Sequence, residues 1–188
     1  GKNWPPASYS PDTHMLYIPT TEWGTRFIRR EGDARAGTMD LGGIPQFDTT
    51  GTGWVVAFDM LSGEIAWQKE MPFTQGAKVS YQKKTRVITI CGTTWQESFE
   101  SEHQDAFLVQ FSPDGEKLHQ HLYGGADMEQ CFDFEALPDG FVVAGHKASH
   151  ESGNWDVWIM RTDTEGNLLW EQTYDQLSNG TSKNIFDE

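Results

Sequence analysis

The chain has 188 residues, which is enough for one ordinary domain. Its formal net charge of −14 argues against nucleic acid and anionic membrane surfaces as partners, because both bind a basic face. Eight Trp, eleven Phe and nineteen Gly, without a long helix-forming run, favour a packed fold of strands and turns.

The first predicted unit spans residues 7 to 73 and consists of two β-hairpins with an insertion between them. "SYSPDTHMLYIP" at 8 to 19 has a short strand, a polar turn and an apolar strand, and residues 54 to 72 have two strands around a glycine turn. The insertion, residues 24 to 53, is rich in Gly, Thr, Asp and Arg and has no usable periodicity. We expect it to be a long loop on one face of the molecule.

Two further units follow, at residues 78 to 124 and 131 to 175, and repeat the same order of strands. Their turn glycines make the repeat visible, because Gly63, Gly115 and Gly166 are 52 and 51 residues apart. Four antiparallel strands at a period of about 40 to 50 residues are typical of a β-propeller blade. The sequence therefore predicts an all-β fold of three four-stranded propeller blades, although a β-sandwich with similar hairpins stays open.

The three blades together belong to residues 1 to 176, and residues 177 to 188 have the composition of a tail or linker. Propellers usually close a ring of about four to eight blades, so three blades leave an incomplete ring. We expect the missing neighbours to come from self-association or from another propeller chain. The N-terminus shows no basic segment followed by an apolar run, and the sequence leaves open whether a leader was removed or the chain is part of a longer one.

Two sets of residues recur at fixed places in the repeat. One set follows each turn glycine by four positions and is expected to dock one blade against the next. The other set lies in the turns and is expected to stabilise them. The docking set is Trp67, His119 and Trp170, and the turn set is Asp59, Asp114 and Asp163. Recurrence in every blade indicates that both sets are structural rather than catalytic.

The N-terminal part of the chain carries motifs of a known family. "KNWPPASYSPDTHMLYIPTTEWG" at 2 to 24 resembles the C-terminal half of alcohol and methanol dehydrogenases that depend on pyrroloquinoline quinone (PQQ). "GWVVAFDMLSGEIAWQKEMP" at 53 to 72 resembles the tryptophan-docking motif of that family. In this N-terminal segment, the residues that match the family's patterns are Asn3, Trp4, Pro6, Tyr9, Pro11, Thr13, Leu16, Tyr17, Pro19, Glu22 and Trp23. The resemblance covers roughly residues 1 to 73, whereas residues 105 to 175 resemble generic bacterial propeller repeats, which imply a fold and no chemistry.

The resemblance implies a quinone held with Ca²⁺ or a lanthanide, a catalytic Asp, an Arg near the quinone and a disulfide between adjacent cysteines. Of this set, only Asn3 stands at a position that contacts the cofactor, and Trp4 beside it is expected to pack against the same site. The catalytic and metal-ligand segments lie earlier in the family's chain, and this sequence has no Cys-Cys pair. We therefore assign no catalytic residue and no metal ligand.

Two functions follow from these expectations. The first is a non-catalytic binding or structural module, which the missing catalytic set favours. The alternative is part of an active quinoprotein alcohol dehydrogenase that oxidises alcohols with PQQ and Ca²⁺ in an assembled form. The resemblance implies a periplasmic or extracellular location in both cases.

Other residues that carry chemistry have a structural interpretation as well. The sequence does not decide whether Cys91 and Cys131 pair, and a small buried thiol is the favoured interpretation of Cys91.

Two pairs of histidines have metal-ligand spacing, but a docking or solvent-exposed role is favoured for them: His119 with His121, and His146 with His150. Alternating acids are interpreted as solvated edge charges rather than cation ligands: Asp127, Glu129, Asp133 and Glu135. A local basic cluster could bind a carboxylate, with pairing inside the chain as the favoured interpretation: Arg26, Arg29, Arg30 and Arg35.

Overall fold

The computed structural model describes residues 5–29, 43–47, 51–72, 74–95, 103–125, 127–148 and 155–174. Within these ranges the strands form three four-stranded antiparallel sheets, which we call blades 1, 2 and 3. Blade 1 consists of β1 (Ser8–Ser10), β2 (Met15–Glu22), β5 (Thr52–Asp59) and β6 (Ile65–Pro72), in the order β1-β2-β5-β6. Blade 2 consists of β7 (Thr74–Gln82), β8 (Val87–Trp95), β9 (Gln104–Phe111) and β10 (Lys117–Tyr123). Blade 3 consists of β11 (Met128–Leu137), β12 (Gly140–Ala148), β13 (Trp155–Thr162) and β14 (Leu168–Tyr174).

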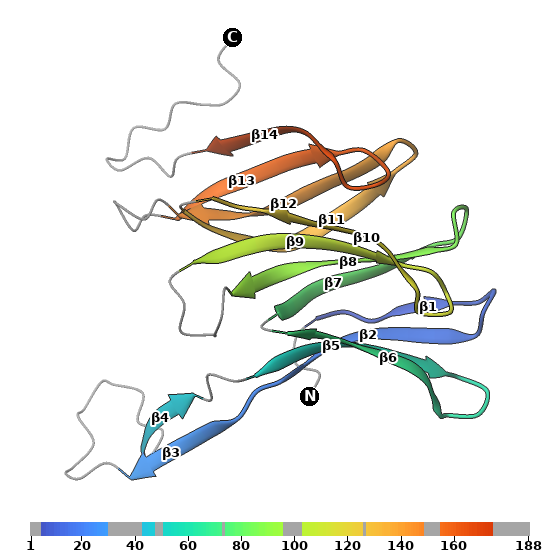
Figure 1. Ribbon diagram of the computed structural model, residues 1–188, viewed down its shortest axis with the longest axis horizontal. Helices are drawn as coiled ribbons and strands as arrows, with labels where there is room; N and C mark the ends of the chain where they lie inside the picture. The colour runs from blue at the N-terminus through green and yellow to red at the C-terminus, as the bar shows by residue number, and fades with distance from the viewer. Residues whose placement is uncertain are drawn as a thin grey trace.

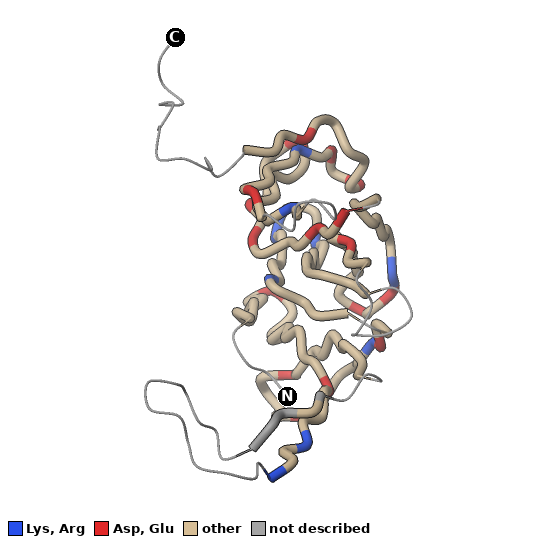
Figure 2. The backbone as a smooth tube through the Cα atoms, turned by 90° about the vertical axis from the view of Figure 1, so that its left-hand side faces the viewer, with Lys and Arg blue, Asp and Glu red and all other residues tan. Residues whose placement is uncertain are grey.

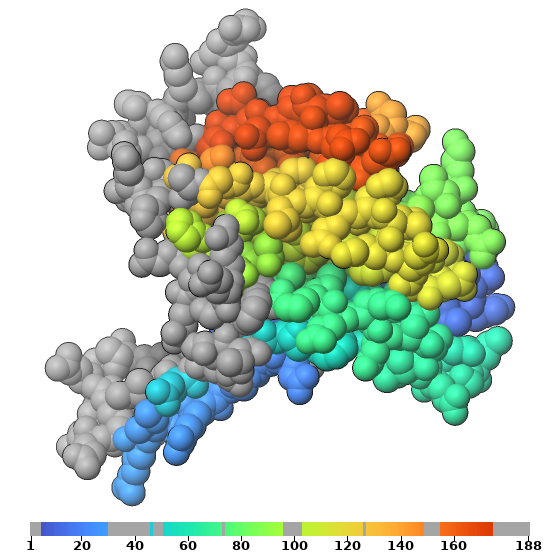
Figure 3. Space-filling model, in the orientation of Figure 1, coloured from blue at the N-terminus to red at the C-terminus, as the bar shows by residue number. Residues whose placement is uncertain are grey.

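The three blades are stacked in chain order, with blade 1 and blade 3 at opposite ends (Figures 1 and 3). In each blade, consecutive strands pair as antiparallel neighbours, apart from the insertion between β2 and β5. The all-β prediction with three four-stranded blades is confirmed. Among the described residues, no helix is long and apolar enough to cross a membrane.

Two apolar clusters hold the stack together, one at each junction between blades. Alternation along the strands sends one set of side chains to each face of a sheet, so a central blade contributes to both clusters. The cluster between blades 1 and 2 consists of Tyr17, Val55, Ala57, Val79, Ile88, Ile90, Phe107, Val109 and Phe111. The cluster between blades 2 and 3 consists of Cys91, Ala106, Leu108, Tyr123, Cys131, Phe134, Phe141, Val143, Trp158 and Met160.

Part of the insertion in blade 1 is a β-ribbon, which corrects the expectation of a long loop. β3 (Thr25–Arg29) and β4 (Gly43–Phe47) pair antiparallel and extend away from blade 1 (Figure 1). All side chains of β3 are exposed, so the ribbon lacks the alternation of buried and exposed residues that would predict it.

A disulfide between Cys91 on β8 and Cys131 on β11 joins blade 2 to blade 3. The interpretation of Cys91 as a free buried thiol is therefore wrong. The two residues are 40 positions apart in the chain, and their Cα atoms lie 6.1 Å apart because the two strands face each other across the junction. Spacing in the sequence does not reveal such a contact between neighbouring sheets.

The turns between the third and fourth strands of each blade, which we call docking turns, comprise residues 59–63, 112–115 and 163–166. Asp163 accepts hydrogen bonds from three backbone N–H groups of its turn and from the Asn167 amide, and these bonds lower its pKa. Asp59 accepts from the N–H of Leu61 in the same way. In blade 2, however, the hydroxyl of Ser112 accepts from the turn, so the stabilising role expected of Asp114 belongs to Ser112.

The docking turns are where one blade contacts the next. Trp67 of β6 donates its indole N–H to the carbonyl of Pro113 at 2.7 Å, which confirms its expected docking role. At the next junction the hydroxyl of Tyr123 donates to the carbonyl of Gly166 at 2.5 Å. The ring nearest Gly166 in the turn of blade 3 is that of His121, two positions after His119 on β10. The docking role expected of His119 stays a prediction.

Charged residues lie over the whole stack rather than in one patch. Figure 2 shows Asp and Glu along all three sheets, with fewer Lys and Arg among them. Among the described residues, four basic side chains form ion pairs within or between blades: Lys78 with Asp133, Lys83 with Asp12, Lys147 with Glu129, and Arg161 with Asp139. Neither sign of charge marks a face as the functional one.

Candidate ligand-binding site between blades 2 and 3

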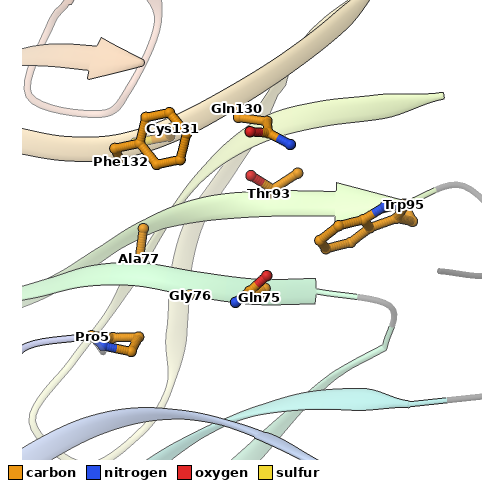
Figure 4. A pocket seen from close by; sticks show the side chains of 9 residues that line it. All are labelled: Pro5, Gln75, Gly76, Ala77, Thr93, Trp95, Gln130, Cys131 and Phe132. Carbon is orange, nitrogen blue, oxygen red and sulfur yellow. The ribbon is translucent and has the colours of Figure 1, made fainter. Parts of the chain in front are cut away.

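A cavity of about 330 Å³ lies at the junction of blades 2 and 3, at the ends of strands β7, β8 and β11. It begins where β7 and β11 start and where β8 ends, on the side away from the docking turns (Figures 1 and 4). The lining residues are Pro5, Gln75, Gly76, Ala77, Thr93, Trp95, Gln130, Cys131 and Phe132. Its volume is at the lower end of the range of small-molecule sites, which is about 300–1,000 Å³.

Close approach of the strands fixes the shape of this cavity. A Cβ atom at Gly76 would lie 2.6 Å from Cβ of Pro19, so β7 can pack against β2 only because residue 76 is glycine. A Cβ atom at Gly92 would overlap the backbone of Gln75, and the disulfide through Cys131 holds β11 against β8. The walls of the cavity are therefore held by backbone packing and by a covalent bond.

The cavity offers neutral polar groups between two aromatic side chains. Figure 4 shows Trp95 and Phe132 at opposite ends of the lining, with Thr93, Gln75 and Gln130 between them. The Gln130 amide donates to Oε1 of Gln104 at 2.6 Å, so this side chain has a defined orientation. A planar molecule with hydrogen-bonding groups at its edge matches such a lining.

None of the described lining side chains titrates, since Cys131 is in a disulfide. A general acid or base must reach the reacting group within hydrogen-bonding distance, directly or through one water. The described lining therefore supplies recognition and no proton transfer.

Glu129, the residue before Gln130, is a buried carboxyl at the same junction, and only 1% of its side chain is exposed. Lys147 Nζ lies 3.0 Å from its Oε1, and neither carboxylate oxygen accepts from any other described group. Burial raises the pKa of Glu129, and the neighbouring Lys147 only partly opposes this effect. For Lys147, burial acts against the charge, but the contact with Glu129 outweighs it and raises the pKa.

The structure places few of the residues that the sequence suggested for chemistry in this cavity. Asn3 and Trp4, the expected cofactor contacts, lie outside the described residues, although Pro5 immediately after them lines the cavity. His150, Arg30 and Arg35 also lie outside the described residues. Arg26 and Arg29 are exposed on β3, on the ribbon of blade 1.

Two of the described histidines contact aromatic side chains. His121 stacks on Tyr123, and His146 lies between Phe132, at 4.9 Å between ring centroids, and Trp155, at 6.2 Å. Among the residues that the structure describes, no three His, Cys, Asp or Glu side chains are arranged to hold a metal ion.

The alternating acids of β11 do not share one face. A bulge between Cys131 and Asp133 shifts the register, so that Glu129 is buried, whereas Asp133 and Glu135 are exposed next to Lys78. The interpretation as solvated edge charges is confirmed for Asp133 and Glu135 and is wrong for Glu129. A bulge leaves no reliable mark in a single sequence, because it needs only one unpaired residue.

Sequence reasoning missed the lining residues Gln75, Thr93, Trp95 and Gln130. They belong to no motif, and the one signal that could have found them is their place in the repeat. Each stands near the end of a strand on the side opposite the docking turns, where neighbouring blades of a propeller leave open space.

PQQ is a planar tricarboxylate, and the described lining does not fit it together with its metal. A tricarboxylate needs cationic partners, and a Ca²⁺ ion needs several oxygen ligands, usually including carboxylates. The lining offers amides, one hydroxyl and aromatic rings, but no cationic side chain and no carboxylate. We therefore derive no reaction step through the quinone from these residues.

Comparisons with known proteins give a distant relationship. No family model matches the chain. A quinoprotein alcohol dehydrogenase of Pseudomonas putida is 29% identical over 104 residues, which is 54% of this chain and 16% of the relative. A quinoprotein ethanol dehydrogenase of Pseudomonas putida is 28% identical over 102 residues, which is 53% of this chain and 16% of the relative. A quinoprotein ethanol dehydrogenase of Pseudomonas aeruginosa is 28% identical over 104 residues, which is 54% of this chain and 17% of the relative. The chain thus matches about a sixth of the length of these relatives.

A solved structure gives a weaker likeness. A quinohemoprotein alcohol dehydrogenase of Pseudomonas putida aligns with 85% of this chain and 22% of its own, at 16% identity and a TM-score of 0.45. The fold rests on the three blades described above and not on this alignment. The sequence comparisons support the resemblance of the N-terminal motifs: over about half its length, the chain is similar to quinoprotein alcohol dehydrogenases.

Proposed function

We propose that this chain is a non-catalytic binding module, a propeller segment related to quinoprotein alcohol dehydrogenases. Its ligand is a small, planar, neutral molecule that carries carbonyl or amide groups. The ligand occupies the cavity between blades 2 and 3, with its edge toward Gln75, Thr93 and Gln130.

The neutral lining of the cavity is the observation that carries this proposal. Aromatic surface at Trp95 and Phe132 favours a flat ring, and the amides provide both donors and acceptors for its substituents. An anion gains little here, because it would lose its hydration without meeting a cation, and the chain itself has a formal net charge of −14.

The alternative is that the chain forms part of an active quinoprotein that oxidises alcohols. Two observations favour it: the similarity to quinoprotein alcohol and ethanol dehydrogenases, and the place of Pro5 in the cavity wall. The residues expected to contact a quinone, Asn3 and Trp4, immediately precede Pro5. The charged groups and the metal would then have to come from residues outside the described lining.

A periplasmic or extracellular location is part of this proposal. The disulfide between Cys91 and Cys131 supports it, since disulfides of this structural kind persist in oxidising compartments and are rare in the cytosol.

Binding of benzamide and benzoate tests the proposed function, because the two probes have the same shape and differ in charge. We expect benzamide to shift the indole N–H resonance of Trp95 with a dissociation constant of roughly 1 mM, which is ordinary for so small a ligand. Benzoate should bind at least about tenfold more weakly at pH 7, because the lining has no cation.

Two matched variants locate the binding. Gln75→Ala removes an exposed amide in the lining, and Gln172→Ala removes an exposed amide on β14 far from the cavity. Benzamide affinity should fall for the first and stay unchanged for the second. Equal affinity for both probes, or an equal effect of both variants, would overturn the proposal.

A further inference from the structure

Both junctions inside the chain use one arrangement: a ring from the fourth strand of one blade covers the docking turn of the next. At the first junction a Cβ atom at Gly115 would lie 2.8 Å from Cδ2 of Trp67, so the indole lies directly on that turn. At the second junction a Cβ atom at Gly166 would lie 2.8 Å from Cδ2 of His121. Both glycines have positive φ, at 82° and 99°, so each turn brings its bare backbone up to the ring.

The first docking turn has the same backbone form and no ring upon it. Gly63 has a φ of 77°, and a Cβ atom placed there would have no described atom within 4 Å. The apolar side chains of this turn, Met60 and Leu61, are 51% and 77% exposed. A turn needs only polar side chains, so two adjacent exposed apolar side chains give this turn a small apolar contact surface.

The last blade carries a ring at the docking position, Trp170, and no described docking turn lies against it. Trp170 follows Gly166 by four positions, as Trp67 follows Gly63, and its side chain is 49% exposed. The strand register places Trp170 beside Arg161 and Val142, and Tyr174 beside Val157, so these positions share the outer face of blade 3. The apolar residues of that face are Val142, Ala144, Val157, Ile159, Trp170 and Tyr174.

Blade 1 has a matching apolar face at the other end of the stack. Its residues alternate with those that pack against blade 2, and the register pairs them across β2 and β5. They are Leu16, Ile18, Trp54 and Phe58, which are half-buried, and Val56, which is buried. Blades 1 and 3 lie at opposite ends of the stack (Figure 1), so one copy of the chain cannot bring its own ring to its own turn.

We propose that a second copy of this chain docks head to tail, with Trp170 of one copy on the Asp59–Gly63 turn of the other. The contact continues the interface that already joins blades 1, 2 and 3, and it covers both apolar end faces at once. Two copies supply six blades, which lies within the usual range of about four to eight for a closed ring. A head-to-tail contact that closes after two copies forms a discrete particle rather than a filament.

Light scattering on the purified chain tests this proposal. The expected mass is that of two chains, each of 21.3 kDa.

Trp170→Ala should raise the dissociation constant of the pair about 30-fold or more, as truncation of a buried interfacial tryptophan does. Leu61→Asp should have the same effect from the other side of the contact, because it places a charge in an apolar contact. Leu118→Ala, an exposed apolar residue of β10 away from both end faces, is the control and should leave the mass unchanged.

Mixing the two variants separates docking from loss of folding. A Trp170→Ala copy keeps an intact first docking turn, and a Leu61→Asp copy keeps an intact Trp170, so one contact forms in the mixture. We expect the mixture to associate more strongly than either variant alone. A chain that stays monomeric at all concentrations, a pair that is insensitive to both variants, or a chain that becomes dimeric only after residues 177–188 are removed would overturn the proposal.

Discussion

The same residue type at the same place in the repeat has different consequences in this chain. Trp67 and Trp170 both follow a turn glycine by four positions, but only Trp67 has a blade beyond it. Its indole N–H bonds to Pro113, and its ring lies near Tyr17 and Phe111. The sequence pattern predicts which residues dock, while the neighbouring blade decides whether a docking ring stabilises the folded chain.

Trp67→Phe should lower the free energy of unfolding by about 2 kcal/mol, because the hydrogen bond to the Pro113 carbonyl is lost and the smaller phenyl ring packs less fully on the turn. Urea denaturation measures the change. Trp170→Phe is the matched control and should leave the stability of the single chain within about 0.5 kcal/mol, as expected for an exposed position. The docking role of Trp67 would be refuted by equal effects of the two substitutions at a concentration where the chain is monomeric.

Glu129 should make the free energy of unfolding decrease as the pH rises. An exposed, ion-paired acid has the opposite effect, because its pKa is lowered in the folded chain. Burial raises its pKa above 4.5, so the folded chain holds this proton more tightly than the unfolded chain does. Unfolding then releases a proton at pH values between 4.5 and the raised pKa, and the free energy of unfolding falls as the pH rises through this window. The slope for one proton is at most about 1.4 kcal/mol per pH unit.

Glu129→Gln removes the titrating proton. The free energy of unfolding of this variant should therefore no longer fall with rising pH because of residue 129. Urea midpoints measured from pH 4.5 to pH 8 would show the difference from the parent chain. The raised pKa of Lys147 lies above 10.5 and contributes stability that is lost only at higher pH, outside this range. Stability curves of the variant and the parent chain that run parallel over this range would show that Glu129 is not responsible.

At the scale of the elements, the repeat in the sequence predicts the four-stranded blades because turn glycines and alternating strands recur at a constant spacing. The ribbon of β3 and β4 is not predictable in the same way, since none of its described side chains is buried and no apolar pattern exists. The disulfide and the bulge in β11 also escape prediction. Each depends on how two sheets meet or on one unpaired residue, and neither changes the local pattern of apolar residues.

Removal of the disulfide should destabilise the chain mainly at the junction of blades 2 and 3. The bond closes a loop across 40 residues, for which the chain-entropy argument gives about 4 kcal/mol. The double variant Cys91→Ala and Cys131→Ala should therefore melt at a lower temperature than the parent chain. Dithiothreitol should lower the melting temperature of the parent and leave that of the variant unchanged, because no described cysteine is free. An equal response of the two proteins to reduction would show that this bond does not hold the blades together.

At the scale of the whole molecule, the described residues form a stack of three blades, with a cavity of uncharged described lining at one junction and apolar residues on both end faces. The cavity could not be predicted from the sequence, because its lining comes from three strand ends and contains no motif. The family resemblance could be predicted, and it gives the ancestry of the segment rather than the chemistry of this cavity. Ligand binding in this cavity and assembly through the end faces are the roles that we propose for the chain.

The most direct test of this account is a calorimetric titration of the chain with PQQ, with and without Ca²⁺. The neutral described lining predicts no stoichiometric uptake under either condition, because it provides neither cations for the carboxylates of PQQ nor carboxylate ligands for the metal. Stoichiometric binding of PQQ that requires Ca²⁺ would contradict the account and favour a working quinoprotein site in this chain.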